Sequence, residues 1–509
     1  MREDQGLREE AVSENKEGVQ ETEGSQPAET AEGKPSGTGR IQGSLQADMA
    51  YLNGVLDVGK NFDMIHRIIH IGGREACMYL IDGFCKDELV QKLLQYFMDL
   101  TPDKMPGDMH GLSKQFTPYV EVDLDDQWDM VIHALLSGIF VLLIDGYKKA
   151  LLIDSRTYPS RGVEEPEKDK TLRGSKDGFV ETLVSNTALI RRRIRSADLH
   201  MEMLGAGVSS RTDIALCYMK ERVDTAFLEE VRQKIQNIRV DSLTMNQESL
   251  AECLYQRKWY NPFPKFKYTE RPDAAAAQVL EGNIVILVDN SPSAMILPTT
   301  IFDVVEEADD YYFPPITGTY LRVTRFLISL LTYLVTPTFL LLINQEQWIP
   351  ESFSFIMLKE EPNLPLIWQF LVLELAIDGL KLAAINTPNM LSTPLSVMAA
   401  LVLGEFSVNS GWFSPEVMLY MAFVAIANYT QANYELGYAL KFMRIITLLL
   451  TQWFSIWGYV GGILLSVLAI GCNRTVSRKS YIYPLIPFDW KNLKNRLIRR
   501  RLPGALKEK

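Results

Sequence analysis

Hydrophobic and polar positions divide the chain into two different halves near residue 310. Before that point, apolar residues come in short runs separated by charged and polar residues. After it, five long apolar stretches follow one another, at 326–343, 364–385, 390–408, 415–432 and 438–472. A helix needs about 20 apolar residues to cross the hydrocarbon core of a bilayer. The pattern therefore predicts a membrane domain behind a large soluble N-terminal half.

The soluble half is interpreted as two α/β subdomains, 50–157 and 178–310, joined by a linker at 158–177 that is rich in proline, glycine and charge. In each subdomain, helices and an apolar strand (77–81 and 214–218) precede a hairpin of two apolar strands. The hairpins turn at Asp145-Gly146 and at Asp289-Asn290, residue types that favour tight turns. This repeated order predicts that the two subdomains are related.

Two more helices are expected from the spacing of apolar residues. Phe62, Ile65, Ile68 and Ile69 recur at helical spacing, and a helix over 197–204 is expected after one over 187–195. The predicted fold class is therefore a soluble α/β N-terminal half with two related subdomains. An all-α polytopic membrane domain, residues 311–475, is expected to follow it.

Charge is distributed unevenly along the 509 residues, which carry a net charge of -11. Residues 1–49 hold eleven acids and five bases with few large apolar side chains, which predicts a disordered acidic tail. Residues 476–509 form a basic tail, with eight bases and one acid between 491 and 509. One acidic end and one basic end argue against a nucleic-acid-binding protein. The five cysteines form no CxxC pair, which favours reduced thiols over a disulfide framework.

The two tails also predict the topology. No apolar run follows the first charges, so no signal peptide is expected, and the basic C-terminal tail is expected in the cytoplasm. If both termini are cytoplasmic, the number of crossings is even. Residues 390–408, which contain a proline, a glycine and a glutamate, are therefore interpreted as broken or re-entrant, leaving four crossings. The alternative is six crossings, with the last stretch split at Gly458, Gly461 and Gly462.

No sequence motif indicates an enzyme. The chain lacks GxxxxGK[ST], HExxH and GxSxG. His66 and His70 are spaced i, i+4 but have no third ligand, so neither a metal nor a cofactor is expected. The basic run IRRRIR at 190–195 leaves two interpretations open. It could bind phosphate or lipid, or its arginines could pair with acids of their own or a neighbouring subdomain.

Charged residues inside the second apolar stretch are the candidate functional residues. Glu374, Asp378 and Lys381 follow one helical stripe at i, i+4 and i+7. A charge at mid-membrane costs at least about 2.5–3.5 kcal/mol, so the stripe is expected to face protein or water. With Glu405, these residues form a candidate ion path, because acidic rings in a pore favour cations. The alternative is a purely structural pair between Asp378 and Lys381.

Several long segments carry a family resemblance. The A subunit of GerA-type spore germinant receptors is similar to GFVETLVSNTALIRRRIRS (178–196), RPDAAAAQVLEGNIVILVDNSPSAMILP (271–298) and YELGYALKFMR (434–444). The stage V sporulation branch of that family is similar to YLIDGFCKDEL (79–89), AAINTPNMLSTPLS (383–396) and YIYPLIPFD (481–489). Together the segments extend the resemblance over about residues 50–490.

The resemblance implies a membrane subunit of an oligomeric ion channel that acts in spore germination. It implies a multi-pass protein of the spore inner membrane with both termini in the cytoplasm. The expected partners are further copies of the chain, as a ring of five subunits, together with membrane lipid and other spore membrane proteins. No catalytic residues follow from it. Two alternatives stay open: a non-conducting scaffold that docks germination partners through its cytoplasmic domains, and the A subunit of a nutrient-responsive receptor.

Overall fold

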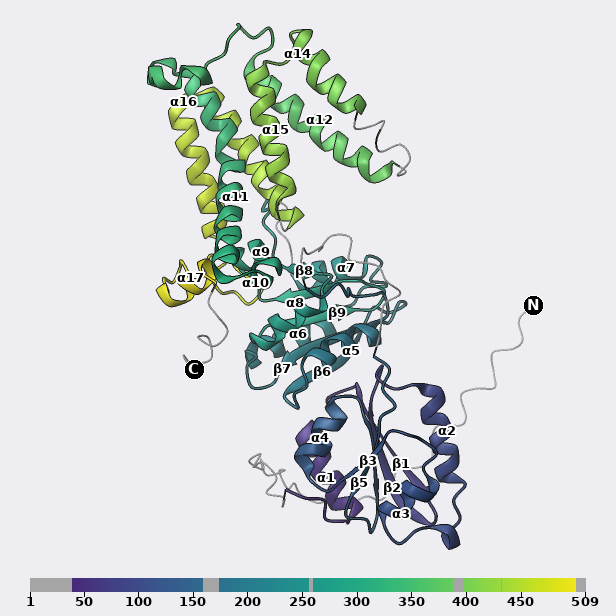
Figure 1. Ribbon diagram of the computed structural model, residues 1–509. Coiled ribbons are helices and arrows are strands. Elements are labelled where there is room, and N and C mark those ends of the chain that lie inside the picture. The colour runs from purple at the N-terminus through teal and green to yellow at the C-terminus, as the bar shows by residue number, and fades with distance from the viewer. Residues whose placement is uncertain are drawn as a thin grey trace, which may run out of the picture.

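The structure is a computed structural model that describes residues 39–158, 174–255, 260–387, 393, 397–431 and 433–499. Two α/β subdomains and a helical bundle follow one another along the molecule (Figure 1). The first subdomain lies at one end, the second in the middle, and the bundle at the other end. The predicted acidic tail up to residue 38 and most of the predicted linker lie outside the described residues.

The first subdomain is a five-stranded antiparallel sheet in the order β1-β2-β4-β5-β3. Its strands are β1 (Met64–Ile71), β2 (Arg74–Ile81), β3 (Val122–Asp125), β4 (Phe140–Ile144) and β5 (Ala150–Ile153). Its helices are α1 (Leu45–Leu56), α2 (Asp87–Met98), α3 (Met109–Phe116) and α4 (Trp128–Leu136), with a 3-10 turn η1 (Pro102–Lys104). Helices α1 and α4 cover one face and α2 and α3 the other, because the central strands are apolar on both faces.

The second subdomain repeats this arrangement. Its sheet has the order β6-β7-β9-β10-β8. The strands are β6 (Leu199–Ala206), β7 (Thr212–Met219), β8 (Lys267–Thr269), β9 (Ile284–Val288) and β10 (Ala294–Leu297). The helices are α5 (Leu183–Arg193), α6 (Thr225–Gln236), α7 (Asn246–Leu254) and α8 (Pro272–Leu280). Helices α5 and α8 cover one face and α6 and α7 the other, so both subdomains share one order of elements, as predicted.

The two additional helices expected near residues 62–69 and 197–204 are wrong, because these segments form strands β1 and β6. Each is the first strand of a hairpin and lies at an edge of its sheet. After β1, Gly72 and Gly73 take positive φ values of 54° and 78° and make the turn into β2. Four successive residues of β1 are exposed, so the alternation that identifies a strand is hidden in the sequence. Helix α1 also begins at Leu45, ahead of the predicted subdomain boundary at residue 50.

The basic run at 190–195 joins the two subdomains. The Arg191 side chain is fully buried and donates two hydrogen bonds to Asp63 of the first subdomain, Nε to Oδ2 at 2.7 Å and Nη2 to Oδ1 at 3.0 Å. Arg193 pairs with Asp177, and the Arg192 guanidinium lies 4.5 Å from the centre of the Tyr158 ring. Of the two interpretations of this run, the structure therefore supports pairing within the protein.

Replacing Arg191 with alanine is expected to lower the free energy of unfolding by about 3–5 kcal/mol, because it leaves Asp63 charged, buried and unpaired. Thermal unfolding of the detergent-solubilised full chain measures this loss. Arg192→Ala, on the same helix but exposed, is the matched control and is expected to cost about 1 kcal/mol or less. Equal losses in the two variants would show that the Asp63 pair does not hold the subdomains together.

The C-terminal half is mostly helical, as expected. Its elements are α9 (Ile301–Val305), α10 (Asp309–Tyr312), α11 (Pro315–Asn344), η2 (Glu346–Trp348), η3 (Glu351–Ile356), α12 (Leu366–Asn386), the π-helical turn η4 (Ala400–Phe406), α14 (Ser407–Asn409), α15 (Pro415–Tyr429), α16 (Tyr434–Gly471) and α17 (Trp490–Leu497). Among the described residues, α11 and α16 are the two helices long and apolar enough to cross a membrane.

Helix α16 is a hairpin of two arms. Ser455 leaves the helical conformation, with φ 51° and ψ -127°, and the chain turns back on itself there. A Cβ at Gly462 would lie 2.7 Å from the Thr447 side chain, and one at Gly458 would overlap the carbonyl of Leu450. Two glycines four residues apart thus let the arms approach closely, as small residues do between membrane helices. The last apolar stretch is split, but ahead of the three glycines proposed from the sequence.

The ends of the bundle are defined by contacts between its loops. Gln345 after α11 donates to Ser455 Oγ at 3.3 Å, so the α16 turn lies at the far end of α11. Asn363 donates to the Gly411 carbonyl at 3.2 Å, which places the start of α15 beside the start of α12. The segment 397–409 therefore returns from the end of α12 to the level where α12 begins. The interpretation of 390–408 as broken or re-entrant stays a prediction, because part of that segment lies outside the described residues.

Candidate functional site

A buried charge cluster connects α12 to the first arm of α16. Glu374 of α12 is 4% exposed, and Arg444 of α16 is 1% exposed. Arg444 donates to Glu374 Oε1 from Nε at 2.9 Å and from Nη2. Its Nη1 donates to the Thr332 carbonyl of α11 at 2.8 Å. One arginine side chain therefore ties three helices together in the apolar part of the bundle.

Lys441 extends this cluster by one helical turn. Its Nζ lies 3.4 Å from Glu374 Oε2, donates to the Glu374 carbonyl at 3.1 Å and forms an ion pair with Asp378. The two bases are spaced i, i+3 on α16 and face two acids spaced i, i+4 on α12, so each pair occupies one face of its helix. Four side chains of balanced charge can be buried together at far lower cost than any one of them alone.

Sequence reasoning identified the acids of this cluster and missed its bases. Lys441 and Arg444 form a pair of cations inside an otherwise apolar run, which is the same signal that identified Glu374 and Asp378. The proposed helix pair between Asp378 and Lys381 is not formed in the structure, since Asp378 pairs with Lys441. The Lys381 ammonium lies instead 5.1 Å from the ring centre of Tyr429 and 5.7 Å from that of Tyr438.

The four candidate residues differ in what they can contact. Glu374 is enclosed by its two partners, whereas the Asp378 side chain is 27% exposed and its Oδ1 accepts no hydrogen bond among the described residues. Glu405 is exposed on the π-helical turn η4, and in the described part of the chain it has no ion pair and no hydrogen bond to the cluster. Such π-helical turns are frequent at functional sites. Asp378, Lys381 and Glu405 are therefore more accessible than Glu374, which is enclosed by Arg444 and Lys441.

A second charge network lies where the bundle meets the second subdomain. Arg322 near the start of α11 donates to Glu306 Oε1 at 2.9 Å and to the Arg496 carbonyl at 2.9 Å. The Arg496 side chain contacts Glu306 Oε2 at 2.8 Å and Asp303 Oδ1 at 2.7 Å. Burial opposes ionisation of Glu306, but the charges of Arg496, Lys267 and Arg322 outweigh it and lower the pKa of this carboxyl below its usual 4.5. The network fixes the C-terminal helix α17 to the first turns of α11.

The contact between α17 and α11 is expected to weaken in acid. Because the pKa of Glu306 is lowered in the folded chain, its stabilising contribution is complete above pH 4.5 and is lost as the pH falls below that value. A spin label at exposed Lys494 is expected to become more mobile over this range. Glu306→Gln is expected to give a mobile label already at neutral pH. A label whose mobility is the same at pH 7 and pH 3 would contradict the role of Glu306.

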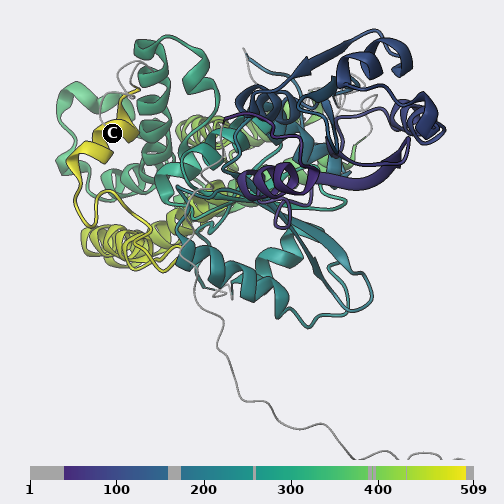
Figure 2. The same cartoon turned by 90° about the horizontal axis from the view of Figure 1, so that it is seen from below.

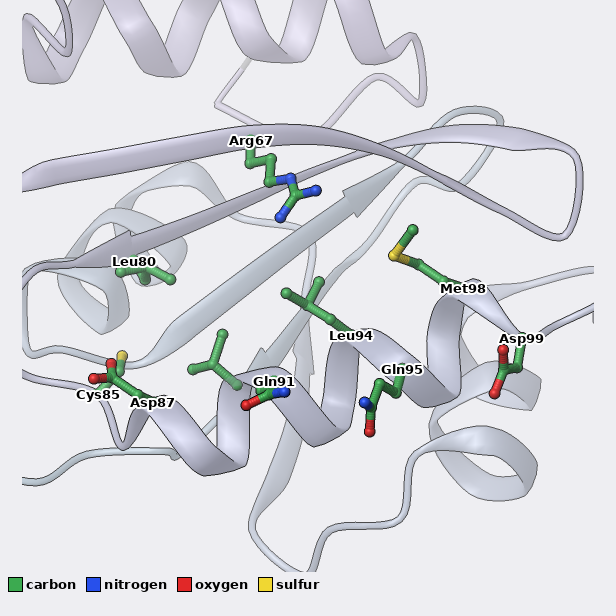
Figure 3. Close-up of a pocket in the computed structure, with 10 residues that line it drawn as sticks. Arg67, Leu80, Cys85, Asp87, Gln91, Leu94, Gln95, Met98 and Asp99 are labelled. Atoms are coloured by element: carbon green, nitrogen blue, oxygen red, sulfur yellow. The ribbon is translucent and has the colours of Figure 1, made fainter.

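An open groove in the first subdomain is a different kind of site. It has a volume of about 570 Å³ and lies between α2 and the edge strand β1 (Figure 3). Arg67 projects into it from β1, and Leu94 and Gln91 face it from α2. The mixture of apolar and amide side chains fits an extended peptide better than a small charged ligand. Among the described residues, no three His, Cys, Asp or Glu side chains are grouped as metal ligands.

Comparisons with known proteins identify the family. The family model described as Bacillus/Clostridium GerA spore germination protein matches residues 51–508. Stage V sporulation protein AF of Bacillus subtilis is 36% identical over 456 residues, which cover 89% of this chain and 92% of that protein. Spore germination protein KA of the same organism is 28% identical over 458 residues, covering 87% of this chain and 82% of that protein.

A solved structure is also similar to part of the chain. It is the crystal structure of the N-terminal domain of the A subunit of the Bacillus megaterium spore germinant receptor GerK3, with 24% identity and a TM-score of 0.40. The match covers 50% of this chain and 95% of that domain. The family model and the 36% identical relative, each of which spans most of the chain, show that this protein belongs to the GerA family of spore germination proteins.

Proposed function

We propose that the chain is a membrane subunit of an oligomeric ion channel that acts in spore germination. The observation that carries the proposal is the charged surface of α12 and of the helix over 397–409. Asp378, Lys381 and Glu405 are at least partly exposed on these two helices. If these side chains faced lipid, each charge would raise the free energy of insertion by at least about 2.5–3.5 kcal/mol. Facing a water-filled path inside a ring of copies, the same charges are solvated and can attract or repel ions.

The path of the chain supports six membrane crossings. They are α11, α12, the helix over 397–409, α15 and the two arms of α16, which leave both termini on the side of the soluble half. In a chain with Cys253 and Cys472 replaced by serine, Ser455→Cys and Ser354→Cys are expected to react with an impermeant maleimide from outside. Val208→Cys, on an exposed loop of the second subdomain, is expected to react only after permeabilisation. Labelling of residues 455 and 208 from the same side would contradict this topology.

The test of the channel itself is electrical. The protein is purified in mild detergent, its mass in the native state is measured, and the oligomer is fused into a planar bilayer. We expect a homo-oligomer, with five copies as the expected number, that conducts cations in preference to anions. An oligomer of stable size that carries no current in any tested salt would argue for the scaffold instead.

The groove between α2 and β1 favours that second candidate function. The outer edge of β1 has no strand beside it in the described structure, and Ile65 and Ile68 are 37% and 53% exposed. An extended partner segment could add to this edge and place side chains in the groove. For a scaffold, Arg67→Glu would abolish partner binding and leave any conductance unchanged, which distinguishes docking from conduction. The similarity to spore germination protein KA keeps the nutrient-responsive A subunit as a further alternative.

A further inference from the structure

A ridge of exposed apolar side chains precedes the C-terminal helix. Leu485, Ile486, Phe488 and Trp490 are 43%, 60%, 67% and 65% exposed. We propose that this ridge, residues 485–490, and α17 form an interfacial anchor that lies in the headgroup region of an anionic lipid leaflet. The proposal rests on the membrane location in the proposed function, and it adds a lipid-binding surface outside the crossing helices.

The ridge is held in one conformation by its neighbours. Tyr481 before it is fully buried, and Asp489 within it accepts hydrogen bonds from the Asn492 backbone N–H at 3.1 Å and from Tyr483 Oη at 3.1 Å. Leu493 of α17 is 8% exposed and packs this helix against the rest of the protein. Because both flanks are fixed, the apolar side chains of the ridge cannot turn inward to escape water. A fixed apolar surface of this kind indicates a contact with something outside the chain.

The position of the ridge points to the membrane surface. Arg322 of α11 donates to the carbonyls of Asn495 and Arg496, and Thr319 Oγ1 accepts from the Arg499 backbone N–H at 3.2 Å. These bonds place α17 beside the first turns of α11, where the exposed apolar side chains of that helix begin with Ile316 and Tyr320. Viewed along the long axis, α17 lies at the outer edge of the molecule, away from the first subdomain (Figure 2). Helix α17, with the ridge that leads into it, thus lies at the level where the apolar surface of α11 begins (Figure 1).

The chemistry of the segment matches an anionic headgroup layer. The Phe488 and Trp490 rings lie 6.3 Å apart, and aromatic side chains of this kind concentrate at the boundary between headgroups and acyl chains. Lys491 and Lys494 are exposed on α17, where they can reach lipid phosphates. Asp489 is the single acid between residues 485 and 499, and it serves to cap α17. A protein partner would favour fewer exposed lysines around the aromatic centre, because charge is depleted in the cores of such interfaces.

Lipid quenching in the reconstituted full chain tests the proposal. In the chain used, Cys253 and Cys472 are replaced by serine, and one new cysteine is labelled with bimane. The vesicles contain equal parts of phosphatidylcholine and phosphatidylglycerol. Part of the phosphatidylcholine bears bromine near the glycerol end of its acyl chains. Phe488→Cys is the test position, Leu464→Cys in the second arm of α16 is the membrane control, and Val208→Cys is the water control. We expect quenching at residue 488 to exceed that at residue 208 by about twofold or more.

The outcomes separate this proposal from the proposed function. Quenching at residue 464 without quenching at 488 overturns the anchor and leaves the membrane domain in place. The measurement is repeated with lipid that bears bromine at the end of its acyl chains. If neither brominated lipid quenches a label at residue 464 or at residue 488, the membrane location itself is overturned. A label at 488 that neither lipid nor aqueous iodide quenches indicates a covering protein, or a second copy of the chain, and also overturns the anchor. Ile486→Cys repeats the measurement in case the Phe488 variant is poorly folded.

The anionic preference has its own test. Replacing Lys491 and Lys494 together by glutamine is expected to reduce quenching at residue 488 by about twofold in the mixed vesicles and to change little in phosphatidylcholine alone. Lys149→Gln, on an exposed turn of the first subdomain, is the matched control and is expected to have no effect. Equal quenching with and without phosphatidylglycerol would overturn the assignment of an anionic leaflet.

Discussion

Replacing Arg444 with alanine is expected to destabilise the helical bundle by about 3–5 kcal/mol, because it leaves a buried carboxylate without its main partner. The variant removes the main partner of Glu374, whose side chain is 6% exposed, and it also frees the Thr332 carbonyl. Lys441 remains, but its Nζ is 3.4 Å from Glu374 and is shared with Asp378. The measurement is equilibrium unfolding of the reconstituted or detergent-solubilised chain.

Two companion variants decide whether the loss comes from the ion pair. Glu374→Leu combined with Arg444→Met removes both charges and is expected to recover most of the stability, because apolar side chains of similar size replace a buried pair at little cost. Lys381→Ala is the control on α12, and it loses only ring contacts worth about 1–2 kcal/mol. If Arg444→Ala costs no more than Lys381→Ala, the cluster is not what holds α12 to α16.

Under the proposed channel function, the ion preference is expected to depend on Asp378 and Glu405 and only weakly on Glu374. In a ring, each exposed carboxylate repeats around the axis and raises the local cation concentration, so Asp378→Asn with Glu405→Gln is expected to lower cation selectivity by on the order of tenfold. Lys381→Gln removes a positive charge and is expected to raise cation selectivity. Reversal potentials of the reconstituted oligomer in a salt gradient measure both changes.

Glu374→Gln gives the contrasting result. This side chain is enclosed by Arg444 and Lys441, so its neutral variant is expected to reduce the amount of folded oligomer more than the ion preference of the channels that form. Unchanged selectivity in the Asp378, Lys381 and Glu405 variants would show that the conducting path does not follow α12. A selectivity change in Glu374→Gln alone would mean that the cluster opens in the conducting state.

The buried strands of both sheets could be predicted from the sequence because each is a short apolar run with a turn residue after it. Strands β1 and β6 could not, since an edge strand with solvent on several successive residues has no clear alternation. The repeated order of elements was visible because the internal hairpins at Asp145 and Asp289 carry strong turn signals. Topology in the soluble half thus follows from local sequence wherever strands are buried on both faces.

The charge cluster shows where sequence reasoning reaches its limit. The spacing of Glu374 and Asp378 shows that they share one face of α12. Their partners lie about 70 positions further along, and the sequence around either pair does not show which face of α12 packs against α16. A split of the last apolar stretch was one alternative from the sequence, but its position at Ser455 was hidden, because serine is no strong helix breaker. Long-range pairing and the direction of the chain both depend on packing between helices, which a single sequence does not record.

The hairpin in α16 has a mechanical consequence. It returns the chain to the point where α11 begins, and Arg322 then joins the two ends through the Arg496 carbonyl and Glu306. The helical half also meets the second subdomain through the segment after α16, where Lys479 pairs with Asp224 and Val476 enters the core of that subdomain. A rotation of that subdomain would therefore act on the helical bundle at two places together, the first turns of α11 and the end of α16.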